Sequence, residues 1–407
     1  MTYDGPTFDD PDLLARLAEL VVRFGANVQP GQVVALGTEP GKEAVARAVA
    51  VAAYKAGAKF VDAVSWDLHI KRARIEHTVE AEMLDYVPPW IGRRVLELGE
   101  LRAARIGLSG LVSPGIMDGL DPARAGRDVL PMVPESGQVV NACTTNWSII
   151  PAPNRAWAQH VHPGLDPDEA WRVFSGQLVH ILRLDEDDPV AAWQQRGATL
   201  GAAAERLTER RFSALRFVSE GTDLTVGLLP GSRFLAAAFE TVDGIDHRPN
   251  LPSEEVFSAP DPQRVDGVVR STKPLALGGA EILGLEVEFR DGRVVRIDAD
   301  QGAEILRAYC ERDAGASRLS EVALVDGDGR IGPLGTSFSD TLIDENAASH
   351  IALGMAYELC VDDADKARVN GSEIHVDFMI GSPEQRVLGV DSAGAEHPVL
   401  TGGRWQL

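Results

Sequence analysis

The alternation of helical and strand patterns in the first third of the chain restricts its fold more than any other feature. Residues 12–24 carry Leu, Val and Phe at helical spacing, between a proline that suits a first turn and a glycine that suits a helix end. The segments 33–36, 43–56 and 59–66 then predict a strand, a helix and a strand, and 105–109 predicts a further strand. This order predicts an α/β N-terminal domain with an open mixed sheet and helices on its faces.

The pattern changes after two long helical segments, 167–184 and 189–211. Short strands separated by glycine turns follow, beginning with 215–218. The chain has 407 residues, more than the roughly 250 to 300 that one hydrophobic core usually serves. We therefore expect two domains: the α/β domain over residues 1–190, and a β-rich α+β domain that binds metal over residues 191–407.

Composition and charge exclude several classes of protein. The fractions of hydrophobic (44%) and charged (25%) residues are those of an ordinary globular protein. The formal net charge of -22 argues against binding to nucleic acid or to an anionic membrane surface, because both demand clustered Lys and Arg. No segment approaches the about 18 apolar residues of a membrane helix, and no signal-peptide pattern opens the sequence. We therefore expect a soluble, cytoplasmic protein.

Several familiar site motifs are missing. The three cysteines, Cys143, Cys310 and Cys360, are far apart and form no Cys-x-x-Cys pair, so we expect buried thiols rather than disulfides or a zinc knuckle. Residues 37–43 differ from a phosphate loop in spacing, and Glu43 stands where Ser or Thr would hold magnesium. Neither Gly-x-Ser-x-Gly nor His-Glu-x-x-His occurs, which removes the usual support for a serine hydrolase or a single-zinc protease.

The richest chemistry lies near the C-terminus. His375 and Asp377 are two residues apart in a segment that reads as a strand. Side chains alternate across a strand, so both ligand types face one side, whereas Ile374 and Val376 face the other. Such an arrangement suits a metal site. A simple pairing of the imidazole with the carboxylate is the alternative.

Other candidate ligands lie upstream. Glu255 and Glu321 are isolated carboxylates in apolar surroundings, and residues 344–350 combine two acids, an amide and an imidazole. Each carboxylate taken singly is also consistent with a solvated surface group. Clusters of Glu, Asp and His are the ligands of divalent zinc, cobalt, manganese or magnesium.

A helix is the local structure that the sequence predicts around His350. The pattern over 344–359 is helical, with Asp344 or Asn346 as its cap. His350 would then lie on the second turn and Tyr357 two turns further along the same face. The alternative for both is core packing with a hydrogen-bonded tip.

The remaining histidines are predicted to lie at the surface or in loops. They are His69, His77, His160, His162, His180, His247 and His397. His247 precedes the block 250–257 and is also a candidate for lining a substrate pocket.

Several blocks of the chain, in the same order, resemble the thermophilic-type aminopeptidases of peptidase family M29, also called aminopeptidase II. The resemblance covers nearly the whole chain and is carried by the blocks 145–151, 221–227, 249–257, 344–350 and 375–381. Ser253 and Phe378 replace residues more usual in that family. The turn 326–329 looks like a variable loop and affects no part of the comparison.

The resemblance implies a two-metal exopeptidase that acts on short peptides with a free N-terminus and forms a homodimer. The metal ligands it implies are Glu255, Glu321, His350, His375 and Asp377, with Glu345 as a further ligand or a base. Tyr357 would lie beside the metals and donate to the oxyanion, and we choose Glu321 as the carboxylate that bridges the two metals. The metals would be zinc, cobalt, manganese or magnesium.

Charge gives an independent reason to expect cations. Glu255, Glu321, Glu345 and Asp377 would repel one another if gathered without compensation, and two divalent ions would neutralise them. A water activated by both metals would then attack the first peptide carbonyl. A two-metal amidohydrolase or phosphoesterase could use the same ligands. A non-catalytic, metal-containing peptide-binding module is a further alternative, although structural zinc sites are usually rich in cysteine.

Overall fold

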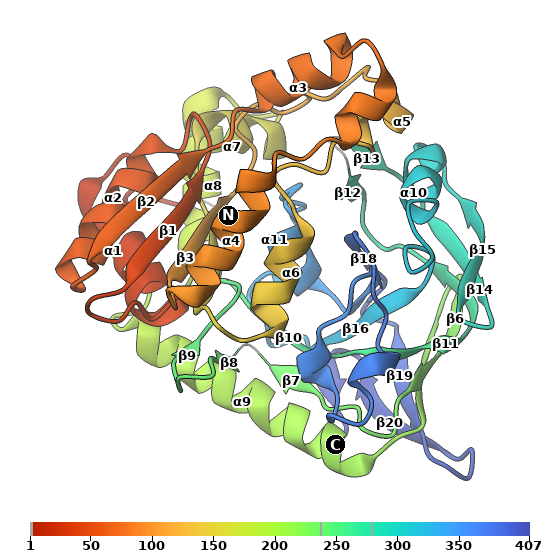
Figure 1. Cartoon of the computed structure of the whole chain (residues 1–407). Coiled ribbons are helices and arrows are strands. Elements are labelled where there is room, and N and C mark those ends of the chain that lie inside the picture. The colour runs from red at the N-terminus through yellow and green to blue at the C-terminus, as the bar shows by residue number, and fades with distance from the viewer. Residues whose placement is uncertain (1–2, 237, 278–279) are drawn as a thin grey trace. The chain divides into compact units, whose positions relative to one another are not determined.

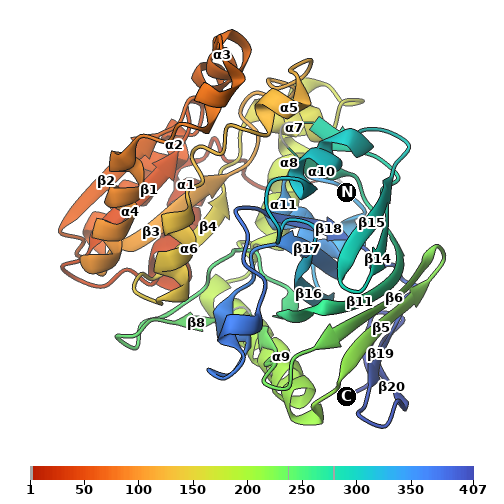
Figure 2. The same cartoon turned by 45° about the vertical axis from the view of Figure 1, so that its right-hand side comes forward.

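The computed structural model describes residues 3–236, 238–277 and 280–407, and it divides into two compact units that are not contiguous in sequence (Figure 1, Figure 2). Unit 1 consists of Met1–Gln195, Ala238–Ser253 and Phe338–Leu342. Unit 2 consists of Arg196–Ala237, Glu254–Ser337 and Ile343–Leu407. The domain boundary at residue 190 remains a prediction. The predicted N-terminal domain did not include the two later segments of unit 1.

Unit 1 is built on a sheet of four strands in the order β2-β1-β3-β4. The strands are β1 (Val33–Thr38), β2 (Phe60–Ser65), β3 (Ala104–Ser109) and β4 (Trp147–Pro151). The predicted open α/β sheet is confirmed in outline, but the prediction of a mixed sheet is wrong for the described strands, because all three pairings are parallel. At least one helix separates each strand from the next, and such a crossover returns the chain in its original direction.

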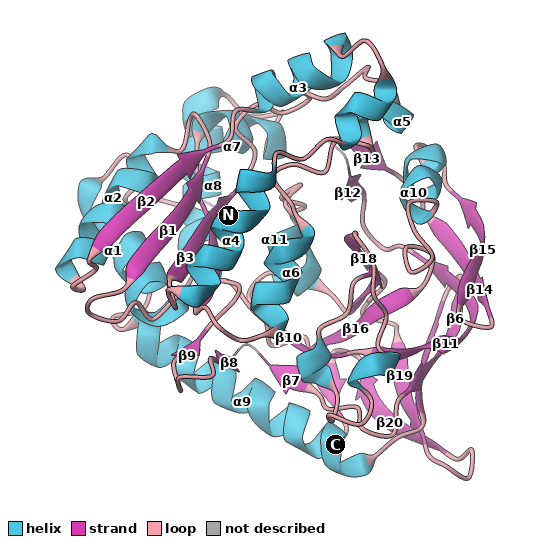
Figure 3. Ribbon diagram, in the orientation of Figure 1, coloured by secondary structure: helices cyan, strands magenta, loops and turns pink. Residues whose placement is uncertain are grey.

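Helices cover both faces of this sheet (Figure 1, Figure 3). Val33 and Ala35 of β1 pack with Leu98 of α4 (Pro89–Glu100). Because side chains alternate along a strand, Val34 and Leu36 point to the opposite face, where the figures place α1 and α2. The other helices of this part are α1 (Pro11–Leu20), α2 (Glu43–Lys55), α3 (Leu68–His77), α5 (Pro122–Ala125), α6 (Pro134–Asn141), α7 (Arg155–Val161) and α8 (Pro167–Ile181).

Local sequence signals explain where these helices begin. The Asp10 side chain accepts a hydrogen bond from the backbone N–H of Asp12, and Pro11 occupies the first turn of α1. α1 is followed by a π-helical turn, Val21–Gly25. The two long helices predicted near the middle of the chain are present as α8 and α9 (Pro189–Arg210). None of the described helices is long and apolar enough to cross a membrane.

His247 is buried in unit 1, so the prediction of a surface or loop position is wrong for this residue. It ends the short strand β9 (Asp246–His247), which pairs with β8 (Phe239–Glu240), and only 2% of it is exposed. Its ring lies 6.1 Å from that of Phe239 and 6.4 Å from that of Trp147. Burial lowers the pKa of His247 to about 4. The other six histidines of that group are exposed or half-buried.

Unit 2 contains two antiparallel sheets. The five-stranded sheet has the order β18-β17-β16-β10-β7, and the eight-stranded sheet has the order β15-β14-β11-β6-β5-β19-β20-β21. The strands of the first are β7 (Leu235–Ala236), β10 (Glu255–Ser258), β16 (Leu319–Val325), β17 (His350–Gly354) and β18 (His375–Met379). Those of the second are β5 (Ala214–Ser219), β6 (Thr222–Leu228), β11 (Pro260–Arg270), β14 (Glu286–Arg290), β15 (Arg293–Asp298), β19 (Arg386–Val390), β20 (Glu396–Thr401) and β21 (Arg404–Trp405).

One hydrophobic core joins the two sheets. Phe217 and Val226 from the eight-stranded sheet belong to the same buried cluster as Val322 and Ile351 from the five-stranded sheet. α10 (Ala303–Cys310) adds Leu306 to this cluster, and β12 (Leu275–Leu277) pairs with β13 (Ala280–Ile282). This part of the chain is therefore built mainly from antiparallel strands. Because one face of the five-stranded sheet packs on the core, its other face is available for a site.

The predicted helix over 344–359 is wrong. The chain forms α11 (Thr341–Asp344) and a 3-10 turn, Glu345–Ala347, and then enters β17 at His350. β17 pairs with β16 on one side and β18 on the other, and these ladders override the weak helical preference of its Ala and Leu residues. His350 and Tyr357 therefore do not share a helix face.

The cysteines agree only in part with prediction. The structure holds all three as thiols. Cys360 is buried, but Cys143 and Cys310 are only half-buried, so the expectation of three buried thiols is wrong for these two.

The burial of His247 makes the stability of unit 1 depend on pH. The unfolded chain protonates this residue near pH 6.5, whereas the folded protein resists protonation until about pH 4. Stability should therefore fall as pH decreases from 6.5 to 4, by up to about 3 kcal/mol. Urea unfolding of His247→Phe, followed at pH 7 and pH 4.5, should show a smaller loss than the unchanged protein. His77→Phe, which alters an exposed histidine, serves as control, and equal losses in all three proteins would contradict this assignment.

Candidate metal centre

Alternation along four neighbouring strands sorts their side chains into two sets. One set faces the core shared by the two sheets: Val256, Val322, Leu324, Ile351, Leu353, Val376 and Phe378. The positions between them face the opposite side, and this second set includes Glu255, Glu321, His350, His375 and Asp377. The five predicted ligands that lie on strands in the structure therefore all face the same side of one sheet.

The strand register brings the ligands on the outer strands together. Glu321 of β16 lies opposite Ala352 of β17, and Ala352 lies opposite Asp377 of β18. Ala352 is fully buried between the two acids. Its methyl group is too short to separate them, so the carboxylates of Glu321 and Asp377 can approach the same space above β17.

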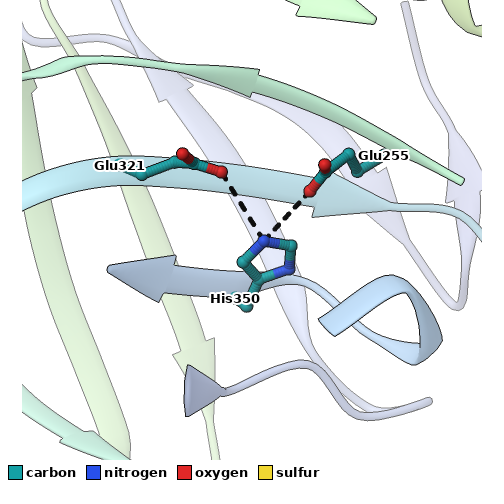
Figure 4. Close-up of side chains that lie close together, drawn as sticks. All are labelled: Glu255, Glu321 and His350. Atoms are coloured by element: carbon teal, nitrogen blue, oxygen red, sulfur yellow. Dashed lines mark ion pairs between the residues drawn. The ribbon is translucent and has the colours of Figure 1, made fainter. Parts of the chain in front are cut away.

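His350 lies between two carboxylates. Its Nε2 is 3.0 Å from Oε2 of Glu255 and 3.7 Å from Oε1 of Glu321. Figure 4 shows both carboxylates directed at the same edge of the ring, one from β10 and one from β16. All three side chains are buried. They form one group of ligand atoms that lie within 4.8 Å of one another.

His375 forms a second group with Glu321 and Asp377. Its Nε2 is 3.4 Å from Oδ1 of Asp377 and 3.8 Å from Oε2 of Glu321. The two oxygens of Glu321 therefore face two different imidazoles, Oε1 facing His350 and Oε2 facing His375. This is the arrangement required of a carboxylate shared between two ions.

Backbone contacts fix the orientation of both imidazoles. Nδ1 of His350 lies 3.2 Å from the carbonyl oxygen of Ala348, and Nδ1 of His375 lies 2.8 Å from that of Met355. A carbonyl only accepts hydrogen bonds, so Nδ1 is the donor in each ring. Nε2 is left to face the carboxylates, which is the usual orientation of a histidine ligand.

Glu345 and Tyr357 complete the set of predicted residues. Glu345 lies in the 3-10 turn before β17, and its carboxylate groups with His350 and Asp377 within the same 4.8 Å limit. The Tyr357 ring lies 6.0 Å from that of His375 and 6.3 Å from that of Phe257. All predicted site residues therefore come together in unit 2. We call six of them the ligand cluster: Glu255, Glu321, Glu345, His350, His375 and Asp377.

Burial and mutual repulsion perturb the carboxyl groups of the cluster. Burial, followed by the charges of Asp377 and Glu255, raises the pKa of Glu345 well above its usual value. Burial also raises the pKa of Glu321. Burial opposes ionisation of Asp377 as well, but the adjacent His375 outweighs it and lowers the pKa of that carboxyl.

The two imidazoles respond in the opposite direction to the acids around them. Although burial favours the neutral ring, the carboxylates of Asp377 and Glu321 raise the pKa of His375 to about 10. Glu255 and Glu321 likewise raise the pKa of His350 well above its usual value. Without metal, the protonated imidazoles of His350 and His375 therefore supply positive charge beside these acids.

The residues fit divalent metal ions. Four carboxylates and two imidazoles are an oxygen and nitrogen ligand set of the kind that zinc and its neighbours accept. The buried Oε2 of Glu255 lacks hydrogen-bond geometry even to His350, 3.0 Å away. Two ligands held about 2.1 Å from a common ion lie about 3.0 to 3.5 Å apart, so this spacing suits coordination better than a hydrogen bond.

One feature next to the cluster was not predicted from sequence. Asp326, which was assigned to a variable loop, is buried and forms an ion pair with the buried Arg196. Arg196 also pairs with Glu254, the residue before Glu255. The sequence does carry one indication of such an ion pair, the adjacent acids Glu254 and Glu255. Two successive carboxylates at the start of an apolar strand both need cationic partners if both are buried.

Comparisons with known proteins agree with this geometry. A family model described as "Thermophilic metalloprotease (M29)" matches residues 11–405. Aminopeptidase T of Thermus thermophilus is 40% identical over 403 residues, covering 96% of this chain and 98% of that protein. Aminopeptidase 2 of Geobacillus stearothermophilus is 34% identical over 403 residues, covering 96% and 97%.

A solved structure extends the similarity to three dimensions. Wild-type AmpT from Thermus thermophilus superimposes with a TM-score of 0.87 at 38% sequence identity, covering 97% of this chain and 99% of that one. The match therefore includes both units, and the family model spans every residue of the ligand cluster. On these grounds the chain belongs to the M29 family of metalloproteases.

Proposed function

We propose that this protein removes N-terminal residues from short peptides with the help of two divalent ions held by the ligand cluster. The family match and the names of the relatives confirm the prediction of a metal-dependent aminopeptidase. The observation that supports two ions is the position of Glu321, whose two oxygens face two different imidazoles. No comparison favours an amidohydrolase, a phosphoesterase or a non-catalytic module.

The ligand cluster divides naturally into two sites that share Glu321. Glu255, Glu321 and His350 would hold one ion, and Glu321, His375 and Asp377 would hold the other. When bound, such ions polarise the peptide carbonyl and make a water more acidic. The ligand types accept zinc, cobalt, manganese or magnesium.

Glu345 is our candidate for proton transfer. It is buried, and its carboxylate lies beside His350 and Asp377. Burial opposes ionisation of its carboxyl, and its place beside the ligands suits a group that accepts and returns a proton. Glu345 would accept the proton of the attacking water and pass it to the leaving amine.

Tyr357 is our candidate for binding the oxyanion. Burial raises the pKa of Tyr357, and the charges of Glu321, Asp377 and Glu345 act in the same direction. The phenol therefore keeps its proton at neutral pH and can donate it as a hydrogen bond to the developing negative oxygen.

Two further features are proposed from the resemblance alone, a free α-amine on the substrate and a homodimeric assembly. A cytoplasmic location is proposed from the sequence patterns. The acidity of the chain, with a net charge of -22, supports a partner other than nucleic acid or an anionic membrane.

Removing and restoring metal tests the proposed reaction. Chelator-stripped protein should fail to hydrolyse leucine p-nitroanilide, and zinc, cobalt, manganese or magnesium should restore hydrolysis with a maximum near two ions per chain. N-acetylated substrate should resist at every metal concentration, because it lacks the free amine. Cleavage of the acetylated compound at a comparable rate would exclude an aminopeptidase.

Substitution of Glu345 separates a base from a ligand. Glu345→Gln should keep two ions per chain while kcat falls by about 10²- to 10⁴-fold, the usual contribution of a proton-transfer group. Metal content measured by atomic emission decides between the roles. Loss of one ion would make Glu345 a ligand, and full turnover with two ions would remove it from the mechanism.

Tyr357→Phe should lower kcat by about 10²- to 10³-fold with metal content unchanged.

Metal binding should release protons. In the metal-free protein the neighbouring carboxylates raise the pKa of His375 to about 10, so its ring is protonated at pH 7. The charged ring stabilises the fold; this stabilisation is complete below pH 6.5 and disappears as pH rises through 10. Coordination requires the deprotonated ring, so metal affinity should rise with pH towards 10. Titration calorimetry at pH 7 in two buffers of different ionisation enthalpy would measure the released protons. Identical heats in both buffers would contradict displacement of a proton.

A further inference from the structure

Arg196 forms a buried ion-pair network beside the ligand cluster. Its guanidinium donates two hydrogen bonds to the carboxylate of Asp326, at 2.8 and 3.1 Å, and its Nε donates to the carboxylate of Glu254. Arg196 is 7% exposed and Glu254 is fully buried. The planar, two-pronged contact with Asp326 is the strong and directional form of this interaction.

The two carboxylates stand at adjacent strand ends. Glu254 comes immediately before β10, and Asp326 comes immediately after β16. These strands are antiparallel, and Glu255 lies opposite Val325, so both residues occur at the same end of the pair. Arg196 therefore fastens together the ends of the two strands that carry Glu255 and Glu321.

Two hydrogen bonds connect the same strand ends to residues adjacent to two more members of the cluster. Asn346 accepts from the backbone N–H of Glu254 at 2.6 Å, and Asn346 follows Glu345 directly. The hydroxyl of Ser349 accepts from the backbone N–H of Val325 at 3.1 Å, and Ser349 directly precedes His350.

A further contact comes from the far end of the chain. The indole N–H of Trp405 donates to Oδ2 of Asp326 at 2.6 Å. With the backbone N–H of Asp328, which donates to Oδ1 at 3.0 Å, the carboxylate of Asp326 has four donors, and its rotamer is fixed. Each contact acts on a residue next to a ligand, or next to a ligand's strand partner, rather than on a ligand itself.

Charge gives the network a second effect. Without Arg196 the buried carboxylates of Glu254 and Asp326 would add two negative charges beside the four acids of the cluster. Removing the cationic partner of a buried carboxylate is strongly unfavourable. Arg196 also holds the carboxylate of Glu254 in an ion pair, whereas the carboxylate of the adjacent Glu255 lies beside His350.

We propose that Arg196 is a positioning residue that, through Glu254 and Asp326, sets the spacing of the metal ligands on β10 and β16 before metal binds. This inference rests on the two-metal function proposed above. Residues that orient metal ligands typically contribute about 10- to 100-fold to metal affinity. Loss of the network should therefore weaken metal binding by about this factor, and turnover should recover when metal is raised to saturation.

Three variants and a matched control test this inference. Arg196→Met removes the guanidinium, Asp326→Asn keeps the shape but removes one charge, and Trp405→Phe removes only the indole donor. Arg216→Met is the control, because Arg216 also bridges two carboxylates, Asp223 and Glu396, but at an exposed position on β5 of the other sheet. Each stripped protein is titrated with zinc against a fluorescent chelator, and its circular dichroism and urea unfolding are recorded without metal.

The expected result is a loss of zinc affinity of about 10- to 100-fold in Arg196→Met and Asp326→Asn, a smaller loss in Trp405→Phe, and none in Arg216→Met. If Arg196→Met fails to fold, Asp326→Asn and Trp405→Phe decide. Native zinc affinity in folded Asp326→Asn, or an equal loss in the control, would overturn the positioning role. Failure of the unchanged protein to bind two ions would instead overturn the proposed function.

Discussion

The gathering of three carboxylates on one buried face of a sheet, with a fourth from the turn before β17, is the constraint on which the rest of unit 2 depends. Burial raises the pKa of Glu345 and Glu321, and the repulsion between like charges in a low-dielectric environment raises it further. Packing of the opposite face onto the eight-stranded sheet holds the acids in place despite it. Cations are then the natural occupants of the space between them, since two dications would balance four negative charges.

Strand alternation lets the same four strands serve both purposes. In β18, Val376 and Phe378 enter the core, whereas His375 and Asp377 face the cluster. A shift of one residue in the register would exchange the two sets, placing charges in the core and apolar groups at the metals. The large hydrophobic cost of that exchange fixes the register, so the core also specifies the geometry of the site.

The sequence predicted some of this site from physics and some only through resemblance. The spacing of His375 and Asp377 shows directly that they share a face, because the period of a strand is two. Glu255 and Glu321 have no such local pattern: their apolar surroundings made them candidates, and the resemblance implied that they are ligands. The residues around His350 favour a helix, and only pairing with β16 and β18 makes it a strand residue. No local pattern predicts the ion pairs of Arg196, because its partners lie 58 and 130 residues away in the chain.

Buried ion pairs such as that of Arg196 rarely explain stability. Replacing a buried charged triad by apolar groups of similar volume is often neutral or stabilising, because desolvation offsets the attraction between charges. Hydrophobic packing alone could therefore close this end of β10 and β16. What packing cannot supply is a directional contact that holds the carboxylate of Glu254 and fixes Asp326 at the end of the strand that carries Glu321. A guanidinium with several fixed donors supplies that direction, which is why we assign Arg196 to the geometry of the metal site rather than to the stability of the fold.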